Sequence, residues 1–232
     1  MIKYPLSITY MSFLNTILNI IFPVNCIRCG KNNTELCIKC LSSFEEAERE
    51  SAEWIFPLYD YRNPSIKKAI WLLKYKSKKG FAKIFAEIMY GRIIEELSDF
   101  SRFNNFQKPI LIPIPLSKRR MHERGFNQAT LICNELIKLD KSHSSDTDRN
   151  FTLEKNILIK TKDKEHQARI EDRKRRLKNI VGSFSVKNIE FIKNRNIILI
   201  DDVTTTGATL GEARKTLRQA GAKKIIAFTV AH

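Results

Sequence analysis

The stretch from Asn196 to Leu210 constrains the fold of this chain most strongly, because an apolar run leads directly into a hydroxyl-rich turn. Ile197–Ile200 is uniformly apolar and ends at two consecutive acids, Asp201 and Asp202. A turn with one glycine follows, and an amphipathic segment begins at Leu210. This order predicts a buried parallel strand, a loop and a helix N-terminus. In open α/β sheets, ligands bind where this loop would lie, beyond the carboxyl ends of the strands.

The loop after this strand carries the side chains that a sugar phosphate requires. Asp201 and Asp202 can only accept hydrogen bonds when ionised, so they suit vicinal hydroxyls or a divalent cation. Gly207 allows a tight turn whose backbone N–H groups converge on an anion at the positive end of a helix. The residues predicted to hold a phosphate are Thr205, Thr206, Gly207, Ala208 and Thr209. A buried strand before a capped helix is the alternative, but it leaves the consecutive acids unexplained.

The periodicity elsewhere predicts an α/β domain around this strand. Further strands are expected at Trp54–Tyr61, Pro109–Pro115, Asn156–Lys160 and Ile225–Val230. Helices are expected after Asn63-Pro64, at Phe81–Leu97, after Arg124–Gln128 and at Gly211–Ala220. The acidic segment Leu41–Glu53 is predicted to be a helical link, and the polar segment Leu139–Phe151 a surface loop.

The balance of charges narrows the classes of partner. The 232 residues are 43% hydrophobic, which is typical of a folded domain and excludes a disordered chain. Forty-one basic against 25 acidic residues give a formal charge of +16, which favours polyanionic partners. The charge fits equally a generic basic surface, or basic residues that bind a small phosphorylated ligand.

The first 24 residues are apolar but interrupted by polar side chains, and no small-residue cleavage pattern follows them. They contain no run of 18 apolar residues that would span a bilayer. Leu14, Ile17, Leu18 and Ile21 share one helical face. We therefore predict an amphipathic helix that docks onto the body or makes weak contact with a membrane or partner. The expected location is cytoplasmic, with no stable membrane span.

Two Cys-x-x-Cys pairs predict a metal site. Cys26 and Cys29 form one pair, Cys37 and Cys40 the other, with seven residues between the pairs. Each pair brings two sulfurs to one side of a tight turn, and two pairs complete a tetrahedral thiolate shell. Two disulfides are the alternative, but a basic chain without a convincing export signal favours reduced thiols. We predict a structural Zn²⁺ that provides the folding free energy of a small module. Cys133 is expected in the core.

The helix predicted after Asn63-Pro64 ends in a basic segment that contains one aromatic residue. Phosphate neutralisation combined with base stacking on Tyr75, Phe81 or Phe126 would suit single-stranded DNA. The candidate nucleic-acid residues are Lys74, Tyr75, Lys76, Lys78, Lys79, Arg119 and Arg120. Lysines are favourable at any helix C-terminus, so a solvated face is the alternative.

The stretch Asp201–Thr209 resembles the signature of type I phosphoribosyltransferases, which bind phosphoribosyl pyrophosphate (PRPP). The resemblance implies an open, mainly parallel sheet flanked by helices, in which the two acids hold the ribose hydroxyls directly or through Mg²⁺. It also implies a pyrophosphate-loop region with Pro115, Leu116, Lys118 and Arg124, and a mobile lid with Gln167, Arg173 and Arg176. Thr205 takes the position where purine-salvage members carry an aspartate base, so purine salvage is not expected.

The combined motifs resemble the ComF family of competence-associated proteins over nearly the whole chain. They are the cysteine pairs, Pro113–Leu116, Arg124–Gln128, Gln167 and Asp201–Thr209. The resemblance implies an N-terminal zinc module at residues 1–50 and a phosphoribosyltransferase-like domain at 51–232. It implies handling of incoming single-stranded DNA on the cytoplasmic side of the inner membrane during natural transformation. A competence helicase or a translocation-channel protein is a candidate partner.

Three functions stay open at this point. The first is DNA handling, with a pocket that binds PRPP or a related phosphoribosyl ligand. The second is an active phosphoribosyltransferase, for which the sequence identifies neither the acceptor nor a general base. The third is a structural role in which the pocket is a relic and the zinc module docks a partner. The complete set of groups for a diol and a phosphate argues against the third.

Overall fold

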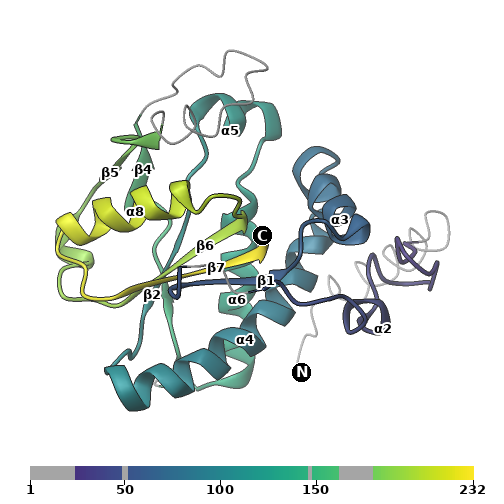
Figure 1. The fold of residues 1–232 in the computed structure, drawn as a ribbon, viewed down its shortest axis with the longest axis horizontal. Helices are drawn as coiled ribbons and strands as arrows, with labels where there is room; N and C mark the ends of the chain where they lie inside the picture. The colour runs from purple at the N-terminus through teal and green to yellow at the C-terminus, as the bar shows by residue number, and fades with distance from the viewer. Residues whose placement is uncertain (1–23, 49–51, 146–147, 162–179) are drawn as a thin grey trace, which may run out of the picture. The chain divides into compact units, whose positions relative to one another are not determined.

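The structure is a computed structural model that describes residues 24–48, 52–145, 148–161 and 180–232 (Figure 1). The chain divides into two compact units, one ending at Phe44 and the other beginning at Glu45. The first unit is small. Its described part has one short helix, α2 (Ile38–Leu41), and an isolated bridge between Asn25 and Asn32.

The second unit is built on a five-stranded sheet in the order β1-β7-β6-β2-β3. Every neighbouring pair of strands is parallel. The strands are β1 (Ile55–Tyr59), β2 (Ile110–Pro113), β3 (Thr152–Leu153), β6 (Ile197–Val203) and β7 (Ile225–Ala231). This arrangement confirms the predicted open, mainly parallel α/β sheet. Since parallel strands end at the same edge, the carboxyl ends of β2, β6 and β7 form one line.

Helices cover both faces of this sheet (Figure 1). They are α3 (Pro64–Tyr75), α4 (Gly80–Asn104), α5 (Lys118–Arg124), α6 (Gln128–His143) and α8 (Ala208–Gln219), with a 3₁₀ turn η1 (Ile189–Phe191). Helices α4 and α6 pack together on one face, and α8 lies on the other. The inner faces of α3, α6 and α8 are those that the apolar spacing predicts. For example, Ile66, Ile70 and Leu73 of α3 are buried.

The core follows the alternation of side chains along the central strand. Ile197 and Leu199 of β6 lie in one apolar cluster with Leu210 and Leu217 of α8. Ile198 and the other even-numbered residues of β6 therefore point to the opposite face, because successive strand residues alternate. All of these apolar side chains have at most 1% exposure. The sheet thus fixes the direction of every side chain at the end of β6, including the two acids.

Two short strands, β4 (Leu158–Lys160) and β5 (Phe184–Val186), form a separate antiparallel pair. The backbone N–H of Gly182 donates to Glu212 Oε1 at 2.6 Å, which links the approach to β5 with α8. The chain between these strands includes the predicted lid residues Gln167, Arg173 and Arg176, which lie outside the described residues.

Two predictions about local structure were wrong. The described part of Leu41–Glu53 is not helical beyond Leu41, because it pairs instead alongside β1. Glu46 forms a bridge with Tyr59, and the N–H of Ala47 donates to the carbonyl of Leu58 at 3.1 Å.

The predicted loop Leu139–Phe151 begins with the last turn of α6. A buried carboxylate explains this extension, because Asp140 accepts hydrogen bonds from Tyr90 Oη, the backbone N–H of Asn150 and Asn150 Nδ2. The sequence pattern gave no sign that Asp140 would be buried.

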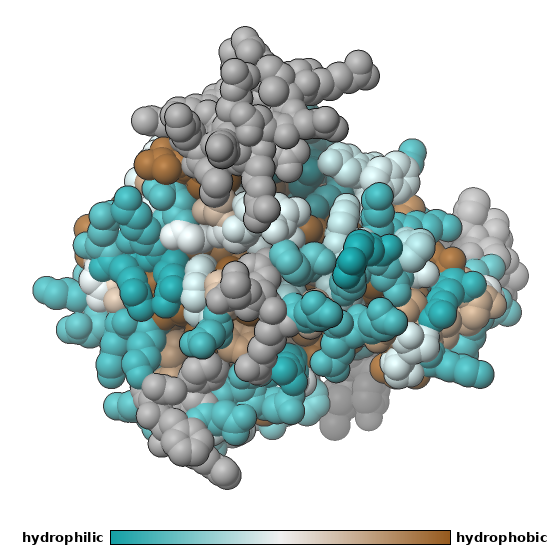
Figure 2. All heavy atoms as spheres, viewed as in Figure 1, coloured by the Kyte–Doolittle hydropathy of each residue, from teal (hydrophilic) through white to brown (hydrophobic). Residues whose placement is uncertain are grey.

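The face of the molecule in Figure 2 is covered mostly by hydrophilic side chains, with apolar ones scattered among them. Among the helices within the described ranges, none combines the length and the apolar character needed to cross a bilayer.

Candidate functional site

The carboxyl end of β6 places its two acids on opposite faces of the sheet. Asp201 and Asp202 are the fifth and sixth residues of this seven-residue strand, so their side chains alternate. Asp201 shares a face with Leu199 and hence with α8, whereas Asp202 points to the side of α3 and α6. Asp201 is half-buried and Asp202 is buried.

Asp202 is held by a lysine from a distant part of the chain. The Nζ atom of Lys74, near the C-terminal end of α3, lies 2.7 Å from Asp202 Oδ1. The side chains of Lys74 and Asp202 are only 17% and 11% exposed. Lys74 was predicted as a nucleic-acid residue from the basic run alone, and its contact with Asp202 was not anticipated. No spacing rule connects a helix end with a strand so far along the chain.

Asp201 has a different environment. Its Oδ1 accepts a hydrogen bond from the backbone N–H of Asp202 at 2.8 Å. Burial, with the neighbouring Asp202 carboxylate, raises the pKa of Asp201 to about 7, while the hydrogen bond from the backbone N–H of Asp202 and the positive charges of Lys74 and Lys160 oppose this rise. Asp201 can therefore exist in either protonation state near neutral pH.

The loop after β6 forms the N-terminus of α8. Gly207 has φ +66°, in the left-handed region, and precedes the first residue of the helix. The N-cap residue Gly207 has no side chain to cap this helix, and the N–H of Ala208, its first residue, donates to Thr206 Oγ1 at 3.4 Å. The first N–H groups of a helix have no intrahelical partners. The N–H of Thr204 donates to the carbonyl of Ala231 at 3.0 Å and anchors the loop to β7. Thr205 is exposed, and Thr206, Gly207, Ala208 and Thr209 are half-buried and accessible.

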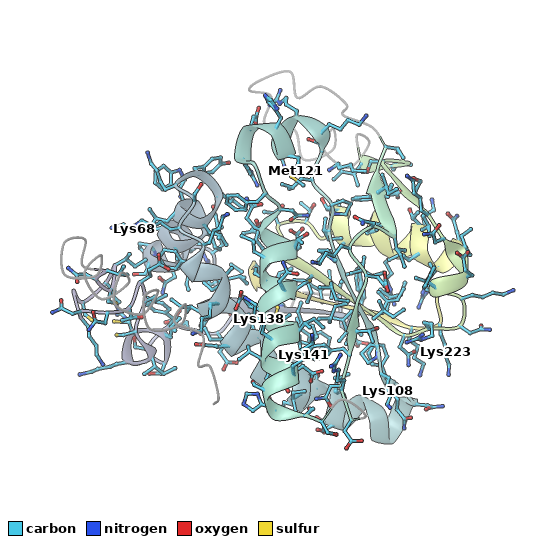
Figure 3. The ribbon with its side chains drawn as sticks, turned by 180° about the vertical axis from the view of Figure 1, so that it is seen from behind. Lys68, Lys108, Met121, Lys138, Lys141 and Lys223 are labelled. Carbon is cyan, nitrogen blue, oxygen red and sulfur yellow. The ribbon has the colours of Figure 1, made fainter. Side chains whose placement is uncertain are left out.

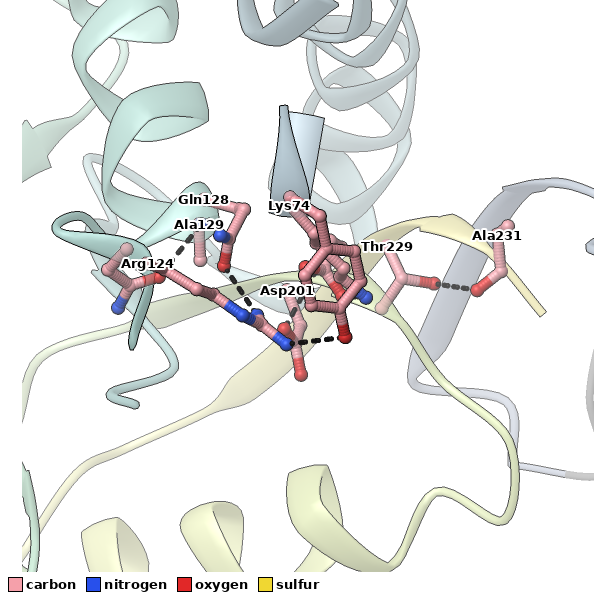
Figure 4. Close-up of polar contacts among 10 residues, drawn as sticks. Lys74, Arg124, Gln128, Ala129, Asp201, Thr229 and Ala231 are labelled. Carbon is pink, nitrogen blue, oxygen red and sulfur yellow. Dashed lines mark hydrogen bonds and ion pairs between the residues drawn. The ribbon is translucent and has the colours of Figure 1, made fainter. Parts of the chain in front are cut away.

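A second set of polar groups comes from the region after β2 (Figure 4). Arg124 donates to Gln128 Oε1 at 3.0 Å and to Tyr75 Oη at 3.3 Å. Gln128 has no exposed surface, yet neither its Nε2 nor Arg124 Nε has a hydrogen-bond partner among the described residues. Tyr75 directly follows Lys74 in α3, so the ion pair with Asp202 and the hydrogen bond from Arg124 are made by adjacent residues.

The remaining pyrophosphate-loop candidates lie at the start of this region. Pro115 and Leu116 are half-buried, and Lys118 is exposed at the first position of α5. The loop is held by Asn127, whose Nδ2 donates to the carbonyl of Ile114 and whose Oδ1 accepts from the N–H of Ala129, both at 2.9 Å. Asn127 thereby fixes the end of β2 against the start of α6.

Exposed aromatic and basic side chains gather at the end of α3 and on α5. Trp71 and Tyr75 are 47% and 57% exposed, with ring centroids 6.1 Å apart. Lys76 Nζ lies 5.5 Å from the Trp71 ring centroid, and the Arg124 guanidinium 5.1 Å from that of Tyr75. We call these four residues the stacking surface. Trp71 was not among the sequence candidates, although its spacing of four residues from Tyr75 was a usable signal.

The remaining candidates for nucleic-acid binding differ in exposure: the basic residues are exposed, and the aromatic residue Phe81 is buried. Lys78, Lys79, Arg119 and Arg120 are exposed, and Lys79 Nζ lies 5.2 Å from the ring centroid of the half-buried Phe126. Phe81 is 1% exposed, so the prediction that bases could stack on it was wrong. As the second residue of α4, it packs on the ring of Phe85 in the core.

The four cysteines of the first unit form a separate site. Their Sγ atoms all lie within 4.8 Å of one another, with Cys26–Cys40 at 3.9 Å and Cys29–Cys37 at 3.6 Å. Tetrahedral Zn²⁺ with sulfur at 2.3 Å requires sulfur–sulfur separations of about 3.8 Å, so the residues fit this metal. All five cysteines of the chain are free in this structure, as a thiolate metal site requires. Cys133 is buried in α6, as predicted.

One thiol of the cluster is also set up to ionise. The Sγ of Cys26 accepts a hydrogen bond from the backbone N–H of Cys37 at 3.4 Å. Burial opposes ionisation, but backbone N–H groups of Cys29, Cys37 and Arg28 hold the pKa of Cys26 below its ordinary value, at about 6. A thiolate that is stable at neutral pH is the form that binds a metal.

Comparison with known proteins identifies homologues with related names. The chain is 36% identical over 146 residues to competence protein ComFC of Bacillus subtilis, covering 62% of this chain and 53% of that protein. It is 31% identical over 156 residues to competence protein F of Haemophilus influenzae, covering 66% and 61%. It is 26% identical over 208 residues to the DNA utilization protein YhgH of Escherichia coli K12, covering 86% and 80%. The matches thus span little more than half the length of the first two relatives.

The chain also matches solved structures, at lower sequence identity. A hypoxanthine phosphoribosyltransferase from Trypanosoma cruzi matches with a TM-score of 0.38 and 11% identity, covering 64% of this chain and 63% of that one. One from Staphylococcus aureus matches with a TM-score of 0.33 and 14% identity, covering 64% and 61%. No protein-family profile matches the chain.

Proposed function

We propose that this chain, a homologue of proteins named for competence and DNA utilization, handles single-stranded DNA during natural transformation and binds PRPP or a related phosphoribosyl ligand. The observation that carries the proposal is that two neighbouring residues of α3 make the contacts: Lys74 pairs with Asp202, and Tyr75 accepts a hydrogen bond from Arg124. These contacts join the loop at the end of β6 to the exposed stacking surface. A sugar phosphate and a nucleic-acid strand would therefore bind to neighbouring parts of one edge of the sheet.

The stacking surface has the two features that single-strand binding needs. Trp71 and Tyr75 offer exposed rings on which bases can stack, and stacking contributes about 1–3 kcal/mol per base without sequence preference. Lys76 and Arg124 lie over these rings and would neutralise phosphates of the same strand. The formal charge of +16 favours the encounter with any polyanion.

Fluorescence anisotropy with a labelled oligothymidine tests the DNA part of the proposal. We expect binding that weakens steeply with salt, and about tenfold weaker binding for Tyr75→Ala. Phe191→Ala is the matched control, because Phe191 is an aromatic residue of similar exposure, 52%, on η1. Binding that ignores salt, or equal affinities for the two variants, would reject the stacking surface as the DNA site.

The phosphoribosyl part assigns roles to the loop after β6. The backbone N–H groups at Gly207–Thr209 would bind the 5-phosphate, and a carboxylate of the acid pair would accept hydrogen bonds from the ribose hydroxyls. Mg²⁺ would accompany the diphosphate of PRPP, and Arg124 with Gln128 supplies donors for it. Calorimetry should give a dissociation constant in the micromolar range, about −8 kcal/mol. The double variant Asp201→Asn/Asp202→Asn should lose this binding, and equal binding by both proteins would reject the site.

The proposal includes a structural Zn²⁺ in the cysteine cluster and a location on the cytoplasmic side of the inner membrane. A competence helicase or translocation-channel protein is the proposed protein partner. The chemistry of the four thiols supports the zinc assignment. The location and the protein partner extend the resemblance to competence proteins and are part of the proposal.

An active phosphoribosyltransferase is the second candidate, favoured by the raised pKa of Asp201. A carboxyl group with a pKa of about 7 is suited to proton transfer at neutral pH, next to where the ribose would lie. Release of pyrophosphate from PRPP across a panel of bases and amines tests this activity. Release that Asp201→Asn abolishes would establish transfer chemistry, whereas no release with any acceptor would leave ligand binding alone.

A further inference from the structure

Lys74 brings a positive charge to the acid pair from outside the loop motif. Its Nζ lies 2.7 Å from Asp202 Oδ1, and both side chains are largely withdrawn from solvent. A lysine so little exposed is stable when paired with a carboxylate, and breaking such a pair leaves an uncompensated charge. The next residue, Tyr75, is bonded to Arg124, so the last turn of α3 is fixed at two points. The ion pair is therefore a built part of the site and not a mobile surface contact.

Because successive side chains of β6 point to opposite faces of the sheet, Asp201 and Asp202 have different neighbours. Asp201 lies on the same face of the sheet as α8, whose N-terminus carries the phosphate-binding loop. Asp202 lies on the opposite face, where Lys74 occupies one of its oxygens. Only Asp201 is thus placed to share a ligand with the N–H groups of Gly207–Thr209.

The same geometry does not suit Mg²⁺ bound directly by both acids. Mg²⁺ requires near-octahedral oxygen ligands at about 2.1 Å. An ammonium group already lies at hydrogen-bond distance from Asp202 Oδ1, so a metal there would be placed against a like charge. The alternation of the strand also directs the two side chains to different faces of the sheet.

We propose that Lys74 is a positioning residue that takes the place of a metal at the acid pair. It neutralises and holds Asp202, and it leaves Asp201 to accept the ribose hydroxyls. This inference rests on the proposed phosphoribosyl site and specifies its ligand class. A ribose 5-phosphate without a diphosphate binds with no Mg²⁺, and Mg²⁺ matters only for ligands whose own diphosphate carries it.

Calorimetry with ribose 5-phosphate, in EDTA and again in millimolar Mg²⁺, tests the role of Lys74. The wild type should bind equally, within twofold, under both conditions. In Lys74→Met, the uncompensated Asp202 carboxylate repels the dianionic ligand, so affinity in EDTA should fall at least tenfold. Mg²⁺ should restore it, because a cation can then neutralise the Asp202 carboxylate, which has lost its ammonium partner. Lys74→Arg should behave as the wild type.

Lys68→Met is the matched control, since Lys68 is an exposed lysine on the same helix (Figure 3). It loses the same charge and should bind as the wild type under both conditions. Thermal melting checks that each variant folds. Should Lys74→Met not fold, Lys74→Gln keeps a hydrogen-bond donor toward Asp202 without the charge and should show the same dependence on Mg²⁺.

The outcomes separate this inference from the proposed function. Wild-type binding of ribose 5-phosphate that requires Mg²⁺ would overturn the role of Lys74 and leave the sugar-phosphate site standing. If folded Lys74→Met and Lys68→Met bind ribose 5-phosphate equally with and without Mg²⁺, the role of Lys74 is likewise overturned and the sugar-phosphate site stands. No binding of ribose 5-phosphate or PRPP by the wild type would overturn the proposed site, and the role of Lys74 with it.

Discussion

The cysteine cluster and the carboxyl edge of the sheet both collect polar groups around a predicted ligand, but they are assembled at different ranges. All four thiols lie between Cys26 and Cys40 and meet through two tight turns. The sheet edge combines acids from β6 with a lysine from α3 and an arginine from α5. The first site is a property of local spacing. The second exists only when the whole domain is folded.

Removing the metal from the cysteine cluster should have the largest effect on stability. A structural zinc site contributes about 10–16 kcal/mol of apparent binding free energy, and so small a module has little else to stabilise it. We expect Cys37→Ser to abolish stoichiometric zinc in metal analysis, whereas Cys133→Ala, which changes a cysteine buried in α6, should retain it.

The two tryptophans, Trp54 and Trp71, both belong to the second unit, so their fluorescence reports the sheet domain alone. If the local cluster is independent, Cys37→Ser should leave the thermal transition of this signal in place. A large loss of melting temperature in the tryptophan signal would contradict the distinction between the two regions.

A pair of asparagines separates local from long-range contributions within the second unit. Asn63 caps α3 by accepting from the N–H groups of Ser65 and Ile66, which is a local contact. Asn127 caps α6 and also donates to Ile114 at the end of β2. We expect Asn63→Ala to cost about 1 kcal/mol, as a cap does. Asn127→Ala should cost about 2 kcal/mol, because it also leaves a buried carbonyl without its partner.

Urea denaturation followed by tryptophan fluorescence measures this difference. Equal costs for the two variants would mean that the contact between Asn127 and Ile114 adds nothing to the cap. The sheet edge would then depend less on long-range contacts than the structure indicates.

A smaller effect concerns the pH dependence of stability. The pKa of Asp201 is about 7 in the folded protein and about 3.9 in an unfolded chain. A raised pKa means that the protonated form stabilises the fold, so this contribution is complete below about pH 4 and is lost as the pH rises through 7. Burial drives the shift together with the Asp202 carboxylate, and the backbone N–H of Asp202 and the charges of Lys74 and Lys160 oppose it.

Asp201→Asn cannot ionise, so it should be more stable than the wild type at pH 8 by about 1 kcal/mol, or about 3 °C in melting temperature. The full shift would give more, but the half-buried carboxyl is partly screened by solvent. Near pH 4 the two melting temperatures should agree. A variant less stable than the wild type at pH 8 would show that ionised Asp201 stabilises the site.

Local patterns predicted most of the fold and part of the site. The apolar run of β6, the inner faces of α3 and α8, and the two cysteine pairs are readable because each depends on neighbouring residues. The pairing of Lys74 with Asp202 is not readable, because it depends on where α3 ends in space. The burial of Asp140 and Phe81 was missed for the same reason.

A crystal structure of the whole chain with PRPP and Mg²⁺ would test the sugar-phosphate site most directly. We predict the 5-phosphate on the N–H groups of Gly207–Thr209, the ribose hydroxyls on Asp201, and Asp202 still paired with Lys74. A ligand bound away from this loop, or a ribose that leaves Asp201 in contact with protein alone, would contradict the assignment.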